Sequence, residues 1–293
     1  MKELTGKEVA ASIYENIEIE SKRLYEQFQH RPTLAVILVG SDPASMAYVS
    51  SKKKKALELG FGHKDISLPA DIDENTLLSH IDDLNRDSEV DGILVQLPLP
   101  AHLDESKVIN SIAAGKDVDG LHPTNMGHLV REEETFISCT PHGILKMLDY
   151  YEIETKGKHV VVIGRSAIVG KPIAALLMQK GRDATVTVCH SRTADLPSFT
   201  RSADILIVAI GRANFVTSDM VKDGAVVIDV GINRVDDASR KRGYRLTGDV
   251  DFDSVASKCT AITPVPRGVG PMTIAMLMYN TLSAAKLHME GRK

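Results

Sequence analysis

The sequence predicts an α/β protein with two domains. At 293 residues the chain is long enough for two domains of ordinary size. Short apolar segments alternate with helical patterns along most of it, as in proteins built on parallel sheets. The clearest signal is at 160–178, where four β-branched residues run into Gly164, a polar turn follows and Gly170 opens an apolar segment. This order indicates a buried parallel strand, a turn and a crossover helix.

The first half of the chain reads as alternating helices and strands. We expect a helix over 5–29, with an apolar stripe at Val9, Ile13, Ile17 and Leu24. A strand over 34–39 follows. The turn at 40–43 leads into a helix from Pro43 or Ala44 to about Leu59, which Gly60 ends. Further strands are expected over 66–68 and 91–97, and further helices over 74–87 and 104–112.

The helix predicted over 43–59 carries a candidate proton-transfer pair. Tyr48 and Lys52 are four residues apart and therefore lie one above the other on the same helix face. We expect a buried stripe at Met46, Val49, Ala56 and Leu57 on a neighbouring face. A free lysine has a pKa of about 10.4, so Lys52 needs a lower pKa to act as a base. Burial or the positive charge of Lys53–Lys55 would lower it. Otherwise these three lysines are a solvated helix face.

Two polar features follow the strand predicted at 91–97. Gln96 interrupts an apolar strand near its carboxyl end, where ligands gather in open α/β sheets. Its amide either faces a ligand or is satisfied by backbone groups. Asp117 and Asp119 lie in a turn-rich segment, 116–123. A metal site is not expected there because no further ligands accompany the two acids. Hydrogen bonding to a substrate, or turn formation, remains open.

A second domain begins near Thr140, which we expect to cap a helix with Pro141 at its first position. After the strand–turn–helix at 160–178, strands are expected over 184–189, 204–210, 225–230, 244–249 and 260–263. A long apolar helix is expected over 272–289, and it can return to the first domain.

The turn after 160–163 is a candidate dinucleotide site, because helix N-termini favour anions. The usual G-x-G-x-x-G spacing is absent, since Ser166 stands where a glycine is expected. An ordinary buried strand–helix turn is the alternative. The strand at 184–189 ends in His190-Ser191-Arg192 and lacks the acidic residue that usually holds the ribose of NAD. Arginine pairs well with phosphate, so Arg192 and Arg165 favour NADP.

Composition excludes several classes of function. The formal net charge of −4 argues against nucleic acid as the main partner. The three cysteines form neither a disulfide framework nor a zinc pattern, which makes a reducing cytoplasm the default. The N-terminus lacks an apolar segment of signal length, and no apolar run approaches the length of a membrane span.

Seven segments together carry a family resemblance. They read V-G-S-D-P-A-S-M-A-Y-V-S-S-K, G-I-L-V-Q-L-P-L-P, K-D-V-D-G, C-T-P-H-G, G-R-S-A-I-V-G-K-P, D-V-G-I-N and P-V-P-R-G-V-G-P-M-T. In this order they resemble the bifunctional methylenetetrahydrofolate dehydrogenase/methenyltetrahydrofolate cyclohydrolase family over essentially the whole chain. The resemblance implies an N-terminal α/β domain, a Rossmann-type NADP-binding domain, an active-site cleft between them and a homodimer. It places 1–139 and the C-terminal helix 272–293 in the folate-binding catalytic domain, and 140–271 in the NADP-binding domain.

The resemblance also implies roles for individual residues. Lys52 resembles the catalytic lysine, Tyr48 the tyrosine that stacks on the substrate, Gln96 the glutamine that supports the lysine, and Asp119 the aspartate that holds the pterin ring. Pro264 and Gly270 fall in the segment expected to contact substrate. The cofactor positions implied are Gly164, Arg165, Ser166, Ser191, Ile232 and Thr140. No metal is implied.

The chain departs from the family pattern at Ala114, at Ser138 and at Arg267, where the family usually has proline, proline and glycine. Arg267 places a side chain in a loop where the family usually has none. Tyr-x-x-x-Lys is also the signature of short-chain dehydrogenases, but there the glycine-rich turn precedes the tyrosine, and here it follows. A monofunctional dehydrogenase and a non-enzymatic NADP-sensing protein are the remaining alternatives. Lys52 and Gln96 together favour two activities.

Overall fold

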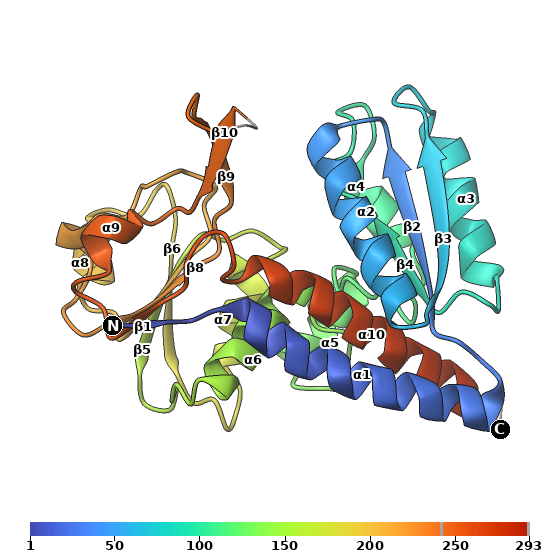
Figure 1. Ribbon diagram of the computed structural model, residues 1–293, viewed down its shortest axis with the longest axis horizontal. Helices are drawn as coiled ribbons and strands as arrows, with labels where there is room; N and C mark the ends of the chain where they lie inside the picture. The colour runs from blue at the N-terminus through green and yellow to red at the C-terminus, as the bar shows by residue number, and fades with distance from the viewer. Residues whose placement is uncertain (241–242, 292–293) are drawn as a thin grey trace. The chain divides into compact units, whose positions relative to one another are not determined.

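The computed structural model describes residues 1–240 and 243–291. The chain divides into two compact units. Unit 1 comprises Met1–Ala11 and Thr140–Thr273, and unit 2 comprises Ser12–Cys139 and Ile274–Lys293. Two long helices, α1 (Gly6–Phe28) and α10 (Gly270–Glu290), contribute residues to both units (Figure 1).

Unit 2 is built on a three-stranded parallel sheet in the order β3–β2–β4. The strands are β2 (Thr33–Val39), β3 (Gly62–Leu68) and β4 (Gly92–Val95). Helices α2 (Pro43–Glu58) and α3 (Glu74–Arg86) lie on opposite sides of these strands (Figure 1), and α4 (Glu105–Ser111) and α5 (Pro123–Val130) follow β4 along the chain. Ile37 and Ile93 from the sheet pack with Leu77 and Ile81 of α3 in the core. The central strand, β2, is buried because it is covered on both faces.

Unit 1 is built on a six-stranded sheet in which all pairings are parallel. Its order is β1 (Lys2–Glu3), β11 (Ala261–Ile262), β8 (Val226–Asp229), β7 (Ile205–Val208), β5 (His159–Ile163) and β6 (Thr185–Cys189). From β5 the chain first adds β6 on one side and then β7 on the other. The carboxyl ends of β5 and β7 therefore mark a topological switch point, where doubly wound sheets bind ligands.

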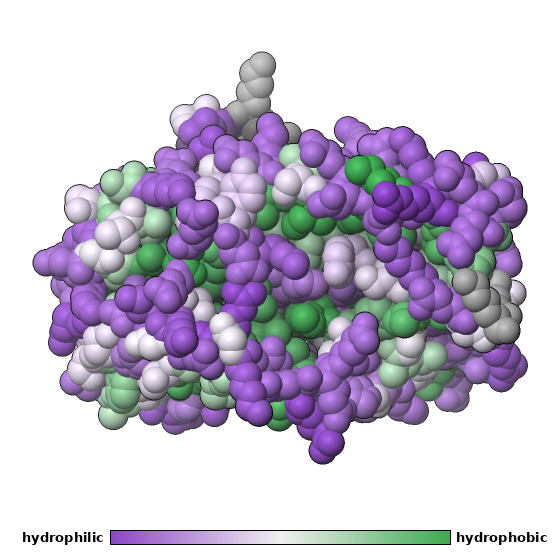
Figure 2. Space-filling view, turned by 90° about the horizontal axis from the view of Figure 1, so that it is seen from below, coloured by the Kyte–Doolittle hydropathy of each residue, from purple (hydrophilic) through white to green (hydrophobic). Residues whose placement is uncertain are grey.

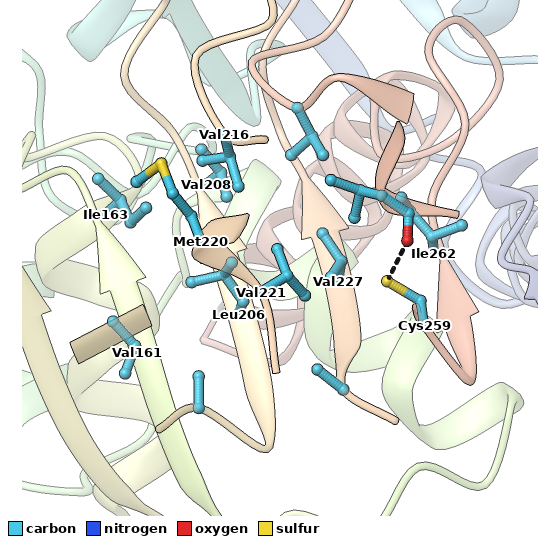
Figure 3. Packing of buried hydrophobic residues seen from close by; sticks show 14 of the residues in the cluster. Val161, Ile163, Leu206, Val208, Val216, Met220, Val221, Val227, Cys259 and Ile262 are labelled. Atoms are coloured by element: carbon cyan, nitrogen blue, oxygen red, sulfur yellow. Dashed lines mark hydrogen bonds between the residues drawn. The ribbon is translucent and has the colours of Figure 1, made fainter. Parts of the chain in front are cut away.

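The remaining elements of unit 1 cover this sheet or extend from it. They are α6 (Cys139–Tyr150), α7 (Gly170–Met178), α8 (Leu196–Thr200), the short helix η1 (Ser218–Met220), α9 (Phe252–Val255) and an antiparallel hairpin of β9 (Asn233–Asp236) and β10 (Tyr244–Thr247). Figure 3 shows how side chains of β5, β7 and β8 pack with Met220, Val221, Cys259 and Ile262. Burial of these aliphatic side chains stabilises the strands whose ends form the switch point.

The predicted α/β class with parallel sheets is confirmed. Most predicted elements lie within a few residues of the observed ones, and 244–249 forms part of the separate hairpin. The elements missed are α5, α8, η1, α9, β1 and β9, which are short. A strand of two residues such as β1 has no readable period and depends on pairing with β11, where Lys2 lies opposite Ala261.

Two local predictions are wrong. Helix α6 begins at Cys139, so Thr140 lies within its first turn instead of capping it. On α2 the buried residues are Ser45, Lys52 and Ala56, whereas Met46 and Leu57 are half exposed. With the partly buried Val49, these residues are spaced by four, three and four, so they lie on one face of α2, and this face includes the lysine.

Within the residues described, no helix combines the length and apolar character needed to cross a membrane. On the face shown in Figure 2, hydrophilic residues predominate and hydrophobic residues appear between them.

Candidate active site

Helix α2 places Lys52 in the interior of unit 2. The helix begins where the Asp42 side chain accepts a hydrogen bond from the Ser45 backbone N–H (2.8 Å), and Pro43 occupies the first turn. This start fixes which residues face inward. Lys52 is only 8% exposed, which is rare for a lysine and costs free energy unless the ammonium group is bonded or becomes neutral.

The partner of Lys52 is Gln96, the residue that follows β4 by one position. Lys52 Nζ donates to Gln96 Oε1 at 2.9 Å. The other half of the amide, Gln96 Nε2, donates to the Leu97 carbonyl oxygen at 2.7 Å. One amide hydrogen is therefore bonded to the backbone, and the amide oxygen accepts from the lysine. Of the two alternatives open for Gln96, the backbone contact is found at Nε2, while contact with a ligand stays a prediction.

Burial lowers the pKa of Lys52, and the nearby Asp119 carboxylate opposes that effect. Burial likewise raises the pKa of Asp119, which the Lys52 charge counteracts. Burial, one of the two causes expected to lower the Lys52 pKa, is the largest effect on it. Lys53 pairs with Asp65 at 2.5 Å and Lys55 with Glu58 at 2.5 Å, both at the surface.

Two acids of the 116–123 segment have different surroundings. Asp117 Oδ2 accepts hydrogen bonds from the His122 backbone N–H (2.7 Å) and from Asn125 Nδ2 (2.9 Å), which fixes the start of α5. Asp119 instead interacts with Lys52 and with the Cys139 thiol. Among the residues described, no group of three or more His, Cys, Asp or Glu side chains could hold a metal ion. The pair is therefore one turn-forming acid and one acid at the lysine.

Two further residues belong to this cluster. Tyr48 lies one turn before Lys52 and is 42% exposed, so its ring is open to a ligand while partial burial raises its pKa. Cys139 is buried, and its thiol pKa is raised by burial and by Asp119. The sequence analysis did not single out Cys139 as a site residue, although it stands in the quoted C-T-P-H-G segment.

In unit 1 the turn between β5 and α7 requires its glycines. Gly164 has a φ of +120°, and a Cβ atom there would lie 2.2 Å from the Ala209 carbonyl oxygen, which follows β7. A Cβ on Gly170 would lie 2.2 Å from the Gly164 carbonyl oxygen. Side chains at either position would force the turn apart. The turn therefore lies tightly against the switch point, where doubly wound sheets bind ligands.

Ser166 shapes the same turn. Its hydroxyl oxygen accepts hydrogen bonds from the backbone N–H groups of Val169 (3.1 Å) and Gly170 (3.4 Å). The hydroxyl proton remains to be donated, so a phosphate oxygen can still be its acceptor. Arg165, beside it, is exposed.

The end of β6 presents two more polar side chains. The His190 backbone N–H donates to Thr193 Oγ1 (2.9 Å), and the Arg192 backbone N–H donates to His190 Nδ1 (3.1 Å). These contacts hold the turn and leave Ser191 and Arg192 exposed. The edge of the sheet that carries the glycine turn also carries these groups, since the carboxyl ends of parallel strands share one edge.

The other predicted site residues of unit 1 are Ile232, Gly270, Thr140 and Pro264. Ile232 is 44% exposed after β8, and a Cβ atom on Gly270 would be 3.4 Å from its Cδ1. Thr140 Oγ1 lies 2.9 Å from Thr273 Oγ1. Pro264 is buried, and its carbonyl oxygen accepts a hydrogen bond from the Gly268 backbone N–H (2.8 Å).

A buried acidic pair organises the loops at this edge, and the sequence analysis missed it. Asp249 is fully buried and accepts hydrogen bonds from the backbone N–H groups of 210–212 (2.7–3.0 Å) and from Asn233 Nδ2 (2.8 Å). Asp229 accepts from the backbone N–H groups of Gly231, Asp249 and Val250. Burial raises the pKa of Asp229 to about 7. The two carboxyl groups tie together the loops that follow β7 and β8.

Family models match both halves of the chain. The catalytic domain of tetrahydrofolate dehydrogenase/cyclohydrolase matches residues 4–119, and the NAD(P)-binding domain of the same family matches residues 138–289. The bifunctional protein FolD of Chlorobium phaeobacteroides strain DSM 266 is 55% identical over 288 residues, which are 97% of this chain and 98% of that protein. The bifunctional protein FolD of Flavobacterium johnsoniae is 51% identical over the full length of both chains.

Solved structures give the same result. The FolD methylenetetrahydrofolate dehydrogenase/cyclohydrolase of Campylobacter jejuni superposes with a TM-score of 0.93 at 48% identity, covering 98% of this chain and 99% of that one. The methylenetetrahydrofolate dehydrogenase-cyclohydrolase of Trypanosoma brucei, complexed with NADP cofactor and an inhibitor, superposes with a TM-score of 0.93 at 39% identity, covering 97% of each chain.

Proposed function

The chain belongs to the tetrahydrofolate dehydrogenase/cyclohydrolase family, and on that premise we propose which residues carry its two reactions. The enzyme oxidises 5,10-methylenetetrahydrofolate with NADP to 5,10-methenyltetrahydrofolate. It then hydrolyses this product to 10-formyltetrahydrofolate. The two steps make different demands on the protein. The first requires orientation, and the second requires proton transfer.

The dehydrogenase step needs no strong acid or base from the protein. The methylene group lies between two nitrogens, whose lone pairs stabilise the cation that remains when hydride leaves. NADP supplies the hydride acceptor when bound. The protein's task is then to hold the substrate in a reactive geometry. We assign this task in unit 2 to Asp119, which would bond the pterin, and to Tyr48, whose exposed ring would stack on it. Pro264 and Gly270 would contribute further substrate contacts.

The hydrolytic step requires a group that moves protons, and we assign that role to Lys52. The observation that supports it is the buried amine, held 2.9 Å from Gln96 Oε1, with a pKa that burial lowers. A lysine with an ordinary pKa is almost entirely protonated near neutral pH and cannot accept a proton. Burial raises the neutral fraction. Gln96 would orient the amine toward the water that attacks the methenyl carbon, because its own position is fixed by the backbone.

The residues of unit 1 fit a bound NADP. The glycine turn, which lies tightly against Ala209 at the switch point, would receive the pyrophosphate, and Arg165 and Ser166 would add contacts there. Ser191 would bind the 2′-phosphate together with Arg192, since both are exposed after β6 where an NAD site carries an acid. Ile232 would cover the nicotinamide, and Thr140 completes the proposed set. Residues 1–139 with 272–293 would then serve folate, and 140–271 would serve the cofactor.

Three properties of the whole protein are also proposals. The family resemblance supports a homodimer, which sedimentation would test. Three free, buried cysteines suit a reducing cytoplasm. The net negative charge suits an enzyme without a nucleic-acid partner.

One absorbance experiment tests the proposed function. Methylenetetrahydrofolate and NADP are mixed with the enzyme, and methenyltetrahydrofolate is followed as it forms and then decays. We expect formation that depends on NADP, and decay faster than without enzyme. Formation with no enzyme-dependent decay would identify a monofunctional dehydrogenase and remove the assignment of Lys52. No formation would refute the proposed function. Comparable catalytic efficiency with NAD would refute the assignment of Ser191 and Arg192.

A further inference from the structure

Asn280 is a polar residue in the apolar interior of unit 2. It lies on α10, is 2% exposed, and has the fully buried Met276 and Ala284 one turn before and after it. A primary amide in such surroundings costs free energy unless its hydrogens are bonded. If this position of α10 only had to fill apolar space, leucine would be sufficient. The amide therefore has a role that packing alone does not explain.

The Asn280 amide donates hydrogen bonds to two segments of unit 2. Asn280 Nδ2 donates to the Val118 carbonyl oxygen at 2.9 Å and to the Ile137 carbonyl oxygen at 2.9 Å. Val118 directly precedes Asp119, and Ile137 lies two positions before Cys139. The Cys139 thiol also donates to the Val118 carbonyl oxygen, at 3.4 Å. One side chain near the end of the chain thus joins the two segments that carry Asp119 and Cys139.

We propose that Asn280 is a positioning residue for the folate-binding half of the active site, which it serves by holding the Val118–Asp119 peptide against the 137–139 segment. The inference rests on the proposed role of Asp119 in holding the pterin. Its physical basis is that the Val118 carbonyl, which Asn280 bonds, belongs to the peptide that leads directly into Asp119. Fixing this peptide limits how far the Asp119 carboxylate can move from Lys52.

The test compares two substitutions on α10. Asn280→Leu removes both donors and keeps a side chain of similar size. Thr281→Val is the matched control, because Thr281 is also fully buried on the same helix, but its hydroxyl donates within the helix to the Leu277 carbonyl oxygen (2.8 Å). Both variants lose buried hydrogen bonds and are expected to unfold at lower temperature than the wild type. Only Asn280→Leu changes a segment that carries a site residue.

We expect Asn280→Leu to raise the KM for methylenetetrahydrofolate by about tenfold, the change that corresponds to one ordinary hydrogen bond. The KM for NADP should stay within about twofold of the wild-type value, because the two backbone carbonyls that Asn280 bonds both belong to unit 2. The pH profile of hydrolysis should also shift, since Asp119 influences the Lys52 pKa. Thr281→Val should leave both KM values and the pH profile unchanged.

The inference would be overturned if Asn280→Leu and Thr281→Val had the same KM values and the same pH profile. It would also be overturned if Asn280→Leu raised the KM for NADP as much as the KM for methylenetetrahydrofolate. If that variant does not fold, Asn280→Ser, which keeps one donor in a smaller side chain, is measured in its place by the same criteria. Failure of the proposed function is distinguishable, because the wild-type enzyme itself would then lack NADP-dependent oxidation or hydrolysis.

Discussion

Replacing Lys52 with methionine should separate the two reactions. Methionine has nearly the same length but no proton to transfer. General acid–base catalysis contributes about 10²- to 10⁴-fold to a rate, or roughly 3–5 kcal/mol at 1.4 kcal/mol per tenfold. We therefore expect enzyme-dependent hydrolysis to fall by at least about a hundredfold. Oxidation should retain most of its rate, because hydride transfer requires no base at Lys52.

The structure also predicts that the Lys52→Met protein folds. The substitution leaves Gln96 Oε1 without its donor, which costs about 1–3 kcal/mol. It also removes a buried amine whose desolvation opposes folding, so the two effects offset each other. Because burial holds the Lys52 pKa below its ordinary value, the unfolded wild type binds more protons than the folded protein in the pH range between those two values. The free energy of unfolding of the wild type should therefore rise, relative to the variant, as pH increases through that range.

The assay follows methenyltetrahydrofolate by absorbance, with purified methenyltetrahydrofolate as a second starting point so that hydrolysis is seen alone. Lys53→Met is the matched control, because Lys53 is half exposed and pairs with Asp65 at the surface. Its hydrolysis rate should equal that of the wild type. A Lys52→Met enzyme with the full hydrolysis rate would refute the assignment. Equal losses of oxidation and hydrolysis would instead indicate that Lys52 acts on the geometry of the whole substrate.

Three further outcomes follow from single residues. Arg267→Gly should raise the free energy of unfolding by about 0.5–1 kcal/mol. The reason is that φ is +89° at Arg267, and a left-handed conformation costs a residue other than glycine about 1–2 kcal/mol, partly offset by the greater entropy of glycine in the unfolded chain. A loss of stability in urea unfolding would show instead that the arginine side chain contributes contacts. Arg192→Ala should reduce the preference for NADP over NAD by about tenfold or more, and the reduction should shrink at high salt; an unchanged ratio of kcat/KM values would contradict it. Burial raises the pKa of Asp229 to about 7. Between pH of about 4 and about 7 the folded protein therefore binds more protons than the unfolded chain, and the free energy of unfolding should fall as pH rises across that range. Asp229→Asn should flatten that fall in urea unfolding, and an unchanged slope would show that other groups cause it.

The sequence predicts the framework of the fold well because apolar runs and turn residues act locally. The strand over 160–163 and the long final helix are examples, and both lie where their patterns indicate. The buried face of α2 was predicted wrongly for the same reason. A local pattern counts Met46 and Leu57 as core and sets Lys52 on a neighbouring face, whereas the register set by the Asp42 cap turns the lysine inward. Gln96, 44 residues away, and Asp119 are the distant partners that make this arrangement tolerable.

The residues of the candidate site could be predicted from the family resemblance. The residues that hold them in place could not. Asp249 and Asn280 carry no local signal, because each is a polar residue in a short stretch that resembles many others. Their partners are distant in sequence. Asp249 bonds the backbone at 210–212, and Asn280 bonds the backbone at 118 and 137. A residue whose function is to bond other residues' backbone becomes visible only when the chain is folded.

The two units solve one problem in the same way. Each uses a buried polar side chain from elsewhere in the chain to hold loops in place. In unit 1 Asp249 bonds the loop that follows β7, and in unit 2 Asn280 bonds the backbone at 118 and 137, in loops that flank α5. An enzyme that relies on orientation for one reaction needs such loops to be rigid before its ligands bind, because ordering them on binding would cost affinity. The second reaction adds only one requirement, a buried amine with a lowered pKa. Under the proposed assignment Lys52 meets it from the face of α2 that packs inward, so the interior that would orient the substrate would also lower the pKa of the base.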